Sequence, residues 1–188
     1  GQNLLHDTNN TYVTVDNVKE LEGLPQANID RAAALAKSIG KEGKYSFNMQ
    51  RPSCNPVLQY CKNRELRKKV YEMYNNRCNH NDEWDNKEIA AKIIALRLEK
   101  ARIMGYTDFA AMQLKDRMAE NKENVYALLD QIWAPAVEKA KEELADIKAM
   151  MKADKVKGEP QRWDYMYYQD KAKMAKYNID ESLVSEYL

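Results

Sequence analysis

The sequence predicts a mainly α protein, an array of helices with long amphipathic members and a small two-stranded β patch near the N-terminus. Three observations lead to this prediction. Apolar residues recur at intervals of three and four over most of the 188 residues. Only 6 Gly and 5 Pro interrupt the chain. The content of 44% hydrophobic and 31% charged residues is typical of an ordered globular protein.

The two predicted strands lie within the first fifty residues. Residues 12–15 are rich in β-branched types, and residues 45–49 alternate between apolar and polar types. Between the strands we expect two helices, a short one capped by Asp16 and a longer one that ends before Gly40. The residues before the first strand are predicted to form a polar tail.

Two further helices are predicted before residue 75. The first follows Pro52, with Ser53 or Asn55 as its N-cap, and the second follows Asn63. The basic side chains of the second helix are predicted to form a solvated face; they are Arg64, Arg67, Lys68 and Lys69. From Asn75 to Asn86 the composition predicts a loop.

The middle of the chain predicts one helix of about five turns and a shorter one. Asp85 and Glu88 have the spacing of a capping box, ahead of an apolar stripe that ends at Gly105. Thr107 or Asp108 is predicted to cap the shorter helix that follows.

The longest periodic run follows Asn121, its predicted N-cap, and continues to Met151. Pro135 is expected to kink this helix without ending it, and the alternative is a pair of helices that break near Trp133. After a break at residues 157–160 we expect a helix over residues 163–174 and another from residue 180 to the last residue.

The charge balance and the cysteine content limit the class of protein. With 30 Lys and Arg against 29 Asp and Glu, the net charge of +1 gives no electrostatic reason to expect a nucleic-acid or membrane partner. No apolar stretch approaches the roughly 18 residues of a spanning helix. The chain has three cysteines, an odd and small number, whereas a disulfide scaffold has an even number at high density. This favours reduced thiols in a cytoplasm.

Candidates for catalysis are scarce. His6 and His80 have no partner at metal-ligand spacing and are predicted to be exposed and non-functional. Cys54 and Cys61 could share a helical face near basic residues, but burial in the core is the favoured interpretation. No phosphate-loop, nucleophile-elbow or zinc-hydrolase motif occurs. The sequence therefore predicts no catalytic, cofactor-binding or metal-binding residue in this chain.

Two other groups of residues are assigned to structure. Solvated surface is predicted for the acidic residues Asp82, Glu83, Asp85, Glu142 and Glu143, which lack the pattern of a calcium loop. The aromatic cluster at residues 163–168 is predicted to pack in the core. Because Tyr167 and Tyr168 cannot face the same way on a helix, one of them is expected to reach a cleft or another part of a larger protein.

Five collinear segments resemble the zinc metallopeptidases of the thimet oligopeptidase family, most closely the bacterial peptidyl-dipeptidases and oligopeptidase A. The first two are LEGLPQANIDRAAALAK at 21–37 and GKYSFNMQRPSCNPVLQYCKNRELRKKVYEMYNNRC at 43–78. The third is DNKEIAAKIIALRLEKARIMGYTDFAAMQLKDRMAEN at 85–121. The others are WAPAVEKAKEELADIKAM at 133–150 and WDYMYYQDKAKMAKYNIDESLVSEYL at 163–188.

This resemblance implies a parent enzyme several times longer, with a channel that admits short unstructured peptides. Its zinc site, a His-Glu-x-x-His helix with a third carboxylate ligand, is expected downstream of the matching stretch. Residues 1–188 would then be a single helical fragment, part of the channel wall and inactive alone. The rest of the same polypeptide would be its partner, and zinc would be bound by the parent rather than by this fragment.

Two alternatives remain open from the sequence. The chain could be a non-catalytic helical interaction module, complete at residue 188, or a nucleic-acid-binding module, which the balanced charge disfavours. If a signal peptide has been removed upstream, the parent would be periplasmic rather than cytoplasmic. A truncated wall is also expected to leave apolar surface uncovered and to self-associate at high concentration.

Overall fold

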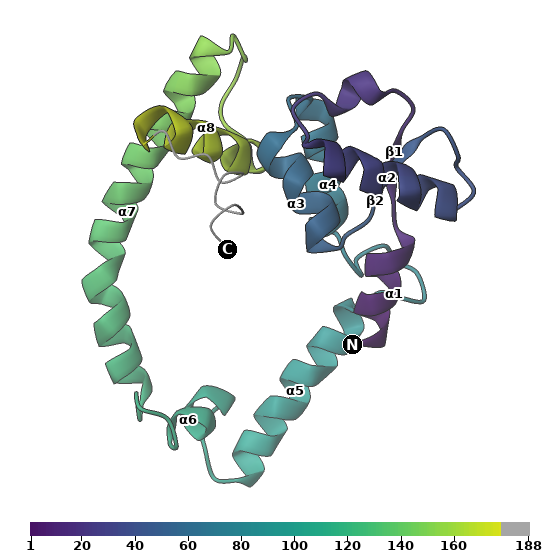
Figure 1. Cartoon of the computed structure of the whole chain (residues 1–188). Coiled ribbons are helices and arrows are strands. Elements are labelled where there is room, and N and C mark those ends of the chain that lie inside the picture. Colours follow the sequence, from purple (N-terminus) through teal and green to yellow (C-terminus); the bar gives the residue numbers. More distant parts are fainter. Residues whose placement is uncertain (178–188) are drawn as a thin grey trace, which may run out of the picture. The chain divides into compact units, whose positions relative to one another are not determined.

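The computed structural model describes residues 1–177 and confirms the mainly α class. The chain forms two compact units, which we call unit 1 (residues 1–84 and those from 144 onward) and unit 2 (residues 85–143). Figure 1 labels the α-helices and the two strands. In chain order they are α1 (Gln2–Asn10), β1 (Val13–Val15), η1 (Val18–Leu21), α2 (Gln26–Ser38), β2 (Tyr45–Phe47), α3 (Arg51–Tyr60), α4 (Arg64–Asn75), α5 (Lys87–Ile103), α6 (Phe109–Leu114), α7 (Lys122–Ala153), η2 (Arg162–Asp164) and α8 (Tyr165–Tyr177).

The predicted β patch is confirmed as an antiparallel pair in unit 1. β1 and β2 align Val13 with Phe47 and Val15 with Tyr45. The hydroxyl groups of Thr14 and Ser46 lie 2.9 Å apart across the pair, within hydrogen-bond distance. β2 ends at Phe47, two residues before the end of the predicted strand.

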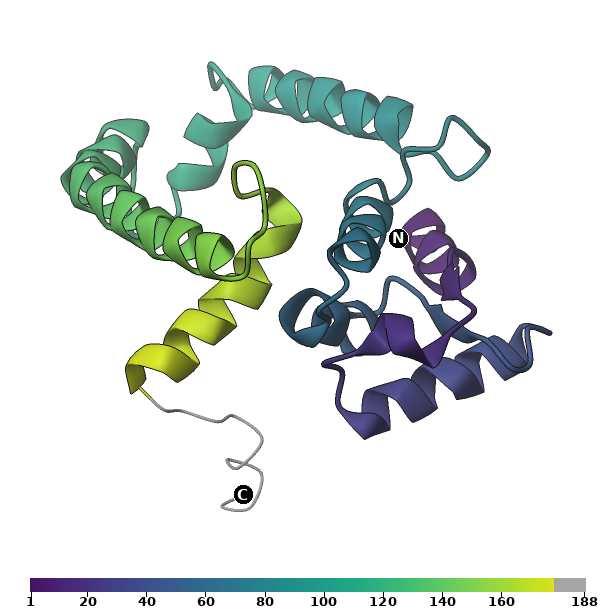
Figure 2. The ribbon, with the colours of Figure 1, turned by 90° about the horizontal axis from the view of Figure 1, so that it is seen from above.

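The main core of unit 1 lies between this patch and the helices α2, α3 and α4, and α8 packs beside α3 (Figures 1 and 2). The apolar stripes of these elements meet there because each has one face with little polar surface. The buried members are Val15, Leu21, Leu24, Ala32, Phe47, Met49, Cys54, Val57, Leu58, Cys61, Leu66, Val70 and Met73. A second core in the same unit joins α7 to α8 through Ile147, Met151 and Tyr168.

Two expectations for the N-terminal segment are wrong. Residues 2–10 form the helix α1 rather than a polar tail. The segment after β1 is capped by Asn17, whose side chain accepts a hydrogen bond from the backbone N–H of Lys19, and it forms the 3₁₀ helix η1. Asp16 is not the cap, because its carboxylate pairs with Lys44 at 2.8 Å instead.

The helix α3 starts earlier than the sequence predicts. It begins at Arg51 with Gln50 as N-cap, so Pro56 lies inside it. Because proline has no backbone N–H, Pro56 cannot donate the helical hydrogen bond that the carbonyl of Pro52, four residues earlier, would otherwise accept. That carbonyl accepts a hydrogen bond from Nη1 of Arg31 on α2 at 3.2 Å, which compensates for the missing donor.

Most other helix boundaries agree with prediction. Asn63, Asp108 and Asn121 each accept a backbone hydrogen bond at the start of a helix. Gly105, with φ of 81°, follows the end of α5. The helix α7 continues through Pro135, so the alternative of two helices that break near Trp133 is wrong. The helix predicted from residue 180 lies outside the described residues.

Candidate functional site

The best-organised polar cluster in unit 1 surrounds Asp164, whose side chain is completely buried. Arg64 pairs with it through Nη2 at 2.7 Å, and Arg67 through Nη2 at 3.1 Å. The backbone N–H of Gln161 donates to the same carboxylate at 2.9 Å. A buried carboxylate is stable only when paired and hydrogen-bonded, and these donors meet that requirement.

The position of Arg67 corrects the prediction of a solvated basic face on α4. This side chain is 1% exposed, and its guanidinium also donates to the carbonyl oxygens of Cys61, Lys62 and Trp163. It lies 4.2 Å from the ring centre of Tyr167, a cation–π distance. Arg67 is buried because it pairs with Asp164. Asp164 belongs to a segment far from α4 in the sequence, so the pattern of α4 alone could not predict this burial.

The aromatic segment at residues 163–168 is divided between two roles. Tyr168 is buried in the second core, as predicted. Tyr167 is half-buried and packs on the guanidinium of Arg67, while Trp163 meets Tyr71 edge to face at 6.2 Å. The segment thus fastens η2 and α8 to α4.

His6 and His80 both have structural neighbours, so the prediction that they are simply exposed is wrong for His6. His6 is half-buried in α1, and its ring stacks on Trp84 with 3.8 Å between ring centres. His80 is exposed, and its Nε2 lies 3.0 Å from Oδ2 of Asp7. The same oxygen accepts the backbone N–H of Cys78 at 2.6 Å, so Asp7 attaches the loop after α4 to α1.

The cysteines occupy core positions, as predicted for Cys54 and Cys61. Both side chains are fully buried, and Cys78 is nearly so. Burial raises the pKa of the Cys54 and Cys61 thiols. A thiol with a raised pKa contains little thiolate at neutral pH and is a poor nucleophile.

The acidic candidates do not form a metal site. Asp82, Glu83, Glu142 and Glu143 are exposed as predicted. Asp85 is not, because its side chain is half-buried and accepts a hydrogen bond from the backbone N–H of Lys87. Across residues 1–177, no three His, Cys, Asp or Glu side chains come together in a group that could hold a metal ion.

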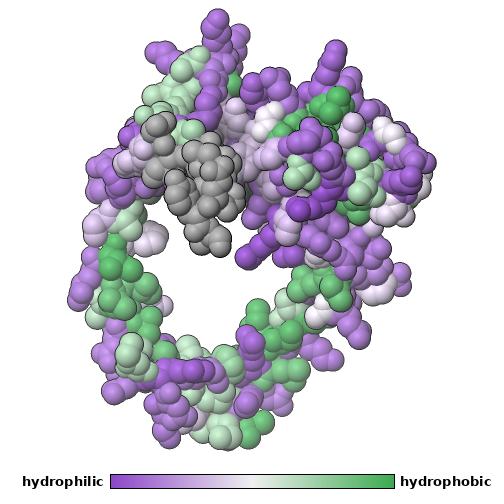
Figure 3. All heavy atoms as spheres, in the orientation of Figure 1, coloured by the Kyte–Doolittle hydropathy of each residue, from purple (hydrophilic) through white to green (hydrophobic). Residues whose placement is uncertain are grey.

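Unit 2 exposes apolar side chains along its helices. In Figure 3 they follow α5 and the part of α7 that belongs to this unit. On α5 the exposed fractions range from 44% to 77%, for Ile89, Ile93, Ile94, Leu96 and Ile103. On α7 the exposed residues are Tyr126, Leu128, Leu129, Ile132 and Trp133. Apolar patches on folded proteins are typical of surfaces that contact another protein segment, a membrane or a ligand.

Comparison with known proteins identifies the family. Residues 57–188 match the model of Peptidase family M3, which is more than half of the chain. The chain belongs to this family. The resemblance seen in the sequence is therefore confirmed at the level of the M3 family.

The M3 relatives include two kinds of peptidase. Over 189 residues the chain is 33% identical to oligopeptidase A of Escherichia coli, covering 98% of this chain and 28% of that protein. It is 31% identical to oligopeptidase A of Haemophilus influenzae, with the same coverage. Identity to dipeptidyl carboxypeptidase of Escherichia coli is 27%, covering 99% of this chain and 27% of that protein. The chain thus spans little more than a quarter of these relatives.

None of the helices formed by residues 1–177 combines the length and the hydropathy that a membrane span requires.

The sequence analysis did not predict the polar cluster around Asp164. A weak signal was present, because Arg67 borders the apolar stripe of Leu66 and Val70 and so lies close to the buried face of α4. Its partner could not be found from the sequence, since it is 97 residues away.

Proposed function

We propose that this chain is a non-catalytic, channel-wall part of a zinc-dependent M3 metallopeptidase that hydrolyses short unstructured peptides. The observation that carries the proposal is the alignment of 98% of the chain with oligopeptidase A, of which it spans 28%. Relatives of two kinds, oligopeptidase A and dipeptidyl carboxypeptidase, align over nearly the whole chain.

The apolar faces of unit 2 support a role inside a larger polypeptide. Leu128 and Ile132 on α7, and Ile93 on α5, lie on faces that are amphipathic in sequence but half exposed in the structure. Side chains of this size contribute about 1.5–3 kcal/mol each when they are buried. The remaining polypeptide of the parent enzyme is the proposed partner that covers them.

We further propose that the chain is inactive alone and binds no zinc. A zinc hydrolase needs three protein ligands and a base that acts on the metal-bound water. His6 stacks on Trp84 and His80 contacts Asp7, and neither belongs to a ligand group in residues 1–177. No step of peptide hydrolysis is therefore assigned to these residues.

An activity assay tests this inactivity. The purified chain is incubated with a quenched fluorescent oligopeptide and added zinc, and oligopeptidase A of Escherichia coli serves as the positive control. We expect no turnover by the chain. Turnover at enzyme-like rates that a chelator abolishes would refute the proposal.

The coding sequence provides an independent test of the peptidase role. Reading the source DNA beyond the codon for the last residue should reveal an in-frame His-Glu-x-x-His within a few hundred codons. A stop codon directly after that position would contradict the peptidase role and favour the interaction module instead.

We propose a cytoplasmic location for the parent enzyme. The three free cysteines are stable in a reducing compartment. One relative, 31% identical over 198 residues, is named probable cytosolic oligopeptidase A of Arabidopsis thaliana. Fractionation of source cells with an antibody against unit 1 tests the location, and recovery with periplasmic proteins would contradict it.

A further inference from the structure

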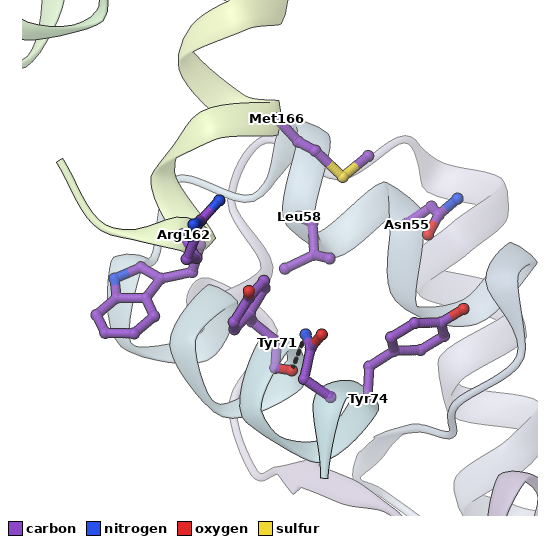
Figure 4. Close-up of a pocket in the computed structure, with 8 residues that line it drawn as sticks. Asn55, Leu58, Tyr71, Tyr74, Arg162 and Met166 are labelled. Carbon is purple, nitrogen blue, oxygen red and sulfur yellow. Dashed lines mark hydrogen bonds between the residues drawn. The ribbon is translucent and has the colours of Figure 1, made fainter. Parts of the chain in front are cut away.

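Unit 1 contains a pocket of about 230 Å³ where α3, α4, η2 and α8 meet. Figure 4 shows Leu58 between Arg162 and Tyr74, with Met166 above it. The lining residues are Asn55, Leu58, Tyr71, Tyr74, Asn75, Arg162, Trp163 and Met166. Pockets for whole cofactors or drug-sized molecules begin at roughly 300 Å³, so this one fits a single side chain with its attached backbone.

The walls of the pocket are held in place before any ligand arrives. Trp163 meets Tyr71 edge to face and lies 5.4 Å from the Lys68 ammonium group. The adjacent Asp164 is fixed by its two arginine partners. Between α3 and α8, Gln59 donates a hydrogen bond to Asp170 at 2.8 Å. A preorganised pocket loses little entropy on binding, which favours a specific ligand.

The interior favours an aromatic side chain. Leu58 is buried, and Met166 contributes a flexible thioether that makes favourable contacts with rings. Three aromatic residues, Tyr71, Tyr74 and Trp163, surround this apolar surface. An inserted ring can pack edge to face against them, which is stronger than the contact of an aliphatic group with the same area.

The polar groups favour a carboxylate next to that ring. Arg162 is exposed at the pocket, and no carboxylate in residues 1–177 pairs with it. In the same described part, the hydroxyl groups of Tyr71 and Tyr74 have no hydrogen-bond partner. A guanidinium binds a carboxylate through parallel hydrogen bonds, and a phenol can donate to a peptide carbonyl.

We infer that this pocket binds the C-terminal residue of a peptide that ends in an aromatic side chain. The ring lies over Leu58 among the three aromatic residues, and the terminal carboxylate pairs with Arg162. Binding is measured on the 188-residue chain itself. The binding test can therefore fail while the proposed peptidase role stands, and the peptidase role can fail while the binding is observed.

The experiment follows NMR signals of the isotopically labelled chain during titration with N-acetyl-L-phenylalanine. We expect saturable shifts centred on the indole of Trp163, with a dissociation constant on the order of 1 mM, because a ligand this small cannot bind tightly. N-acetyl-L-phenylalaninamide, which lacks the carboxylate, should bind about fivefold to tenfold more weakly. N-acetyl-L-alanine should show no saturable shifts.

Two variants and one control locate the site. Arg162→Gln should bind the free acid as weakly as the wild type binds the amide. Met166→Glu places a negative charge in the pocket and should abolish binding of the acid. Arg102→Gln, at an arginine that is also exposed but lies in unit 2, should bind like the wild type. Circular dichroism confirms that each variant is folded.

Several results would overturn the inference. One is equal affinity of the wild type for the acid and for the amide, and another is an unchanged affinity of Arg162→Gln for the acid. Saturable binding of N-acetyl-L-alanine as strong as that of the phenylalanine acid, or no saturable binding of the phenylalanine acid, would also overturn it.

Discussion

Arg64 donates two hydrogen bonds to the carboxylate of Asp164, from Nε to Oδ1 at 2.9 Å and from Nη2 to Oδ2 at 2.7 Å. This parallel geometry is the strongest form of an arginine–carboxylate pair. The two residues are 100 positions apart, and their contact joins the start of α4 to the segment before α8. The stability of unit 1 should therefore depend on this pair and on Arg67 beside it.

Asp164→Asn should lower the free energy of unfolding by about 3–5 kcal/mol, because it leaves the buried Arg67 charge without a counterion. Urea unfolding followed by circular dichroism measures the change. Asp116→Asn is the matched control, since Asp116 is exposed, and its effect should stay within about 0.5 kcal/mol. A loss below about 1 kcal/mol in Asp164→Asn would show that the cluster has little effect on stability.

The same carboxylate should make stability depend on acid pH. Burial raises the pKa of Asp164, but hydrogen bonds from Arg64, Gln161 and Arg67 lower it more, so the pKa lies below 3.8. A depressed folded pKa stabilises the protein above the unfolded pKa, and this contribution is lost as the pH falls through the folded pKa. The urea concentration at the unfolding midpoint should therefore decrease as the pH is lowered below about 5. In Asp164→Asn this decrease with pH should be less steep. Equal slopes would assign the acid sensitivity to other carboxyl groups.

Gly23→Ala should be far more destabilising than Gly40→Ala. Both glycines have positive φ, 97° and 75°, so each alanine carries a backbone strain of about 1–2 kcal/mol. At Gly23 the new Cβ would also lie 2.3 Å from the carbonyl oxygen of Tyr60, whereas nothing lies within 4 Å at Gly40. Thermal unfolding compares the two. Equal losses would indicate that the α3 end moves freely away from the turn.

The thiols of Cys54 and Cys61 should be protected from alkylation in the native protein. Burial raises the pKa of both groups and excludes reagents. With a thiol reagent at pH 8 we expect slow reaction at a rate set by unfolding, and release of all three thiols in urea. Ser38→Cys, which adds an exposed thiol, is the control for reagent activity. Rapid modification of the wild type under native conditions would contradict the buried assignment.

The exposed apolar face of α7 should cause the isolated chain to self-associate. Sedimentation across a dilution series should give an average mass that rises above 21.9 kDa with concentration. The double change Leu128→Lys and Ile132→Lys should reduce the association, because both side chains are more than half exposed. Glu138→Lys, at an exposed charged position, is the control. A strictly monomeric wild type at all concentrations would argue against a docking surface.

Local patterns predicted the elements well where the determinant lies within a few residues. Asn63 and Asp108 cap helices because their side chains reach a backbone N–H three positions ahead. Prediction failed where a distant group intervenes. Asp16 forms an ion pair with Lys44 instead of capping a helix. The carbonyl of Pro52 accepts a hydrogen bond from Arg31, which compensates for the donor that Pro56 lacks inside α3.

The sequence by itself determined the helical class, the β patch, most of the helix boundaries and the family resemblance, because these depend on periodicity, capping and collinear motifs. Only the tertiary structure decided which polar side chains are buried and which apolar faces are exposed. Arg67 is buried because Asp164 folds against it, and Ile93 is half exposed because no described segment covers it. Burial is a property of contacts between distant segments, and no local pattern contains it.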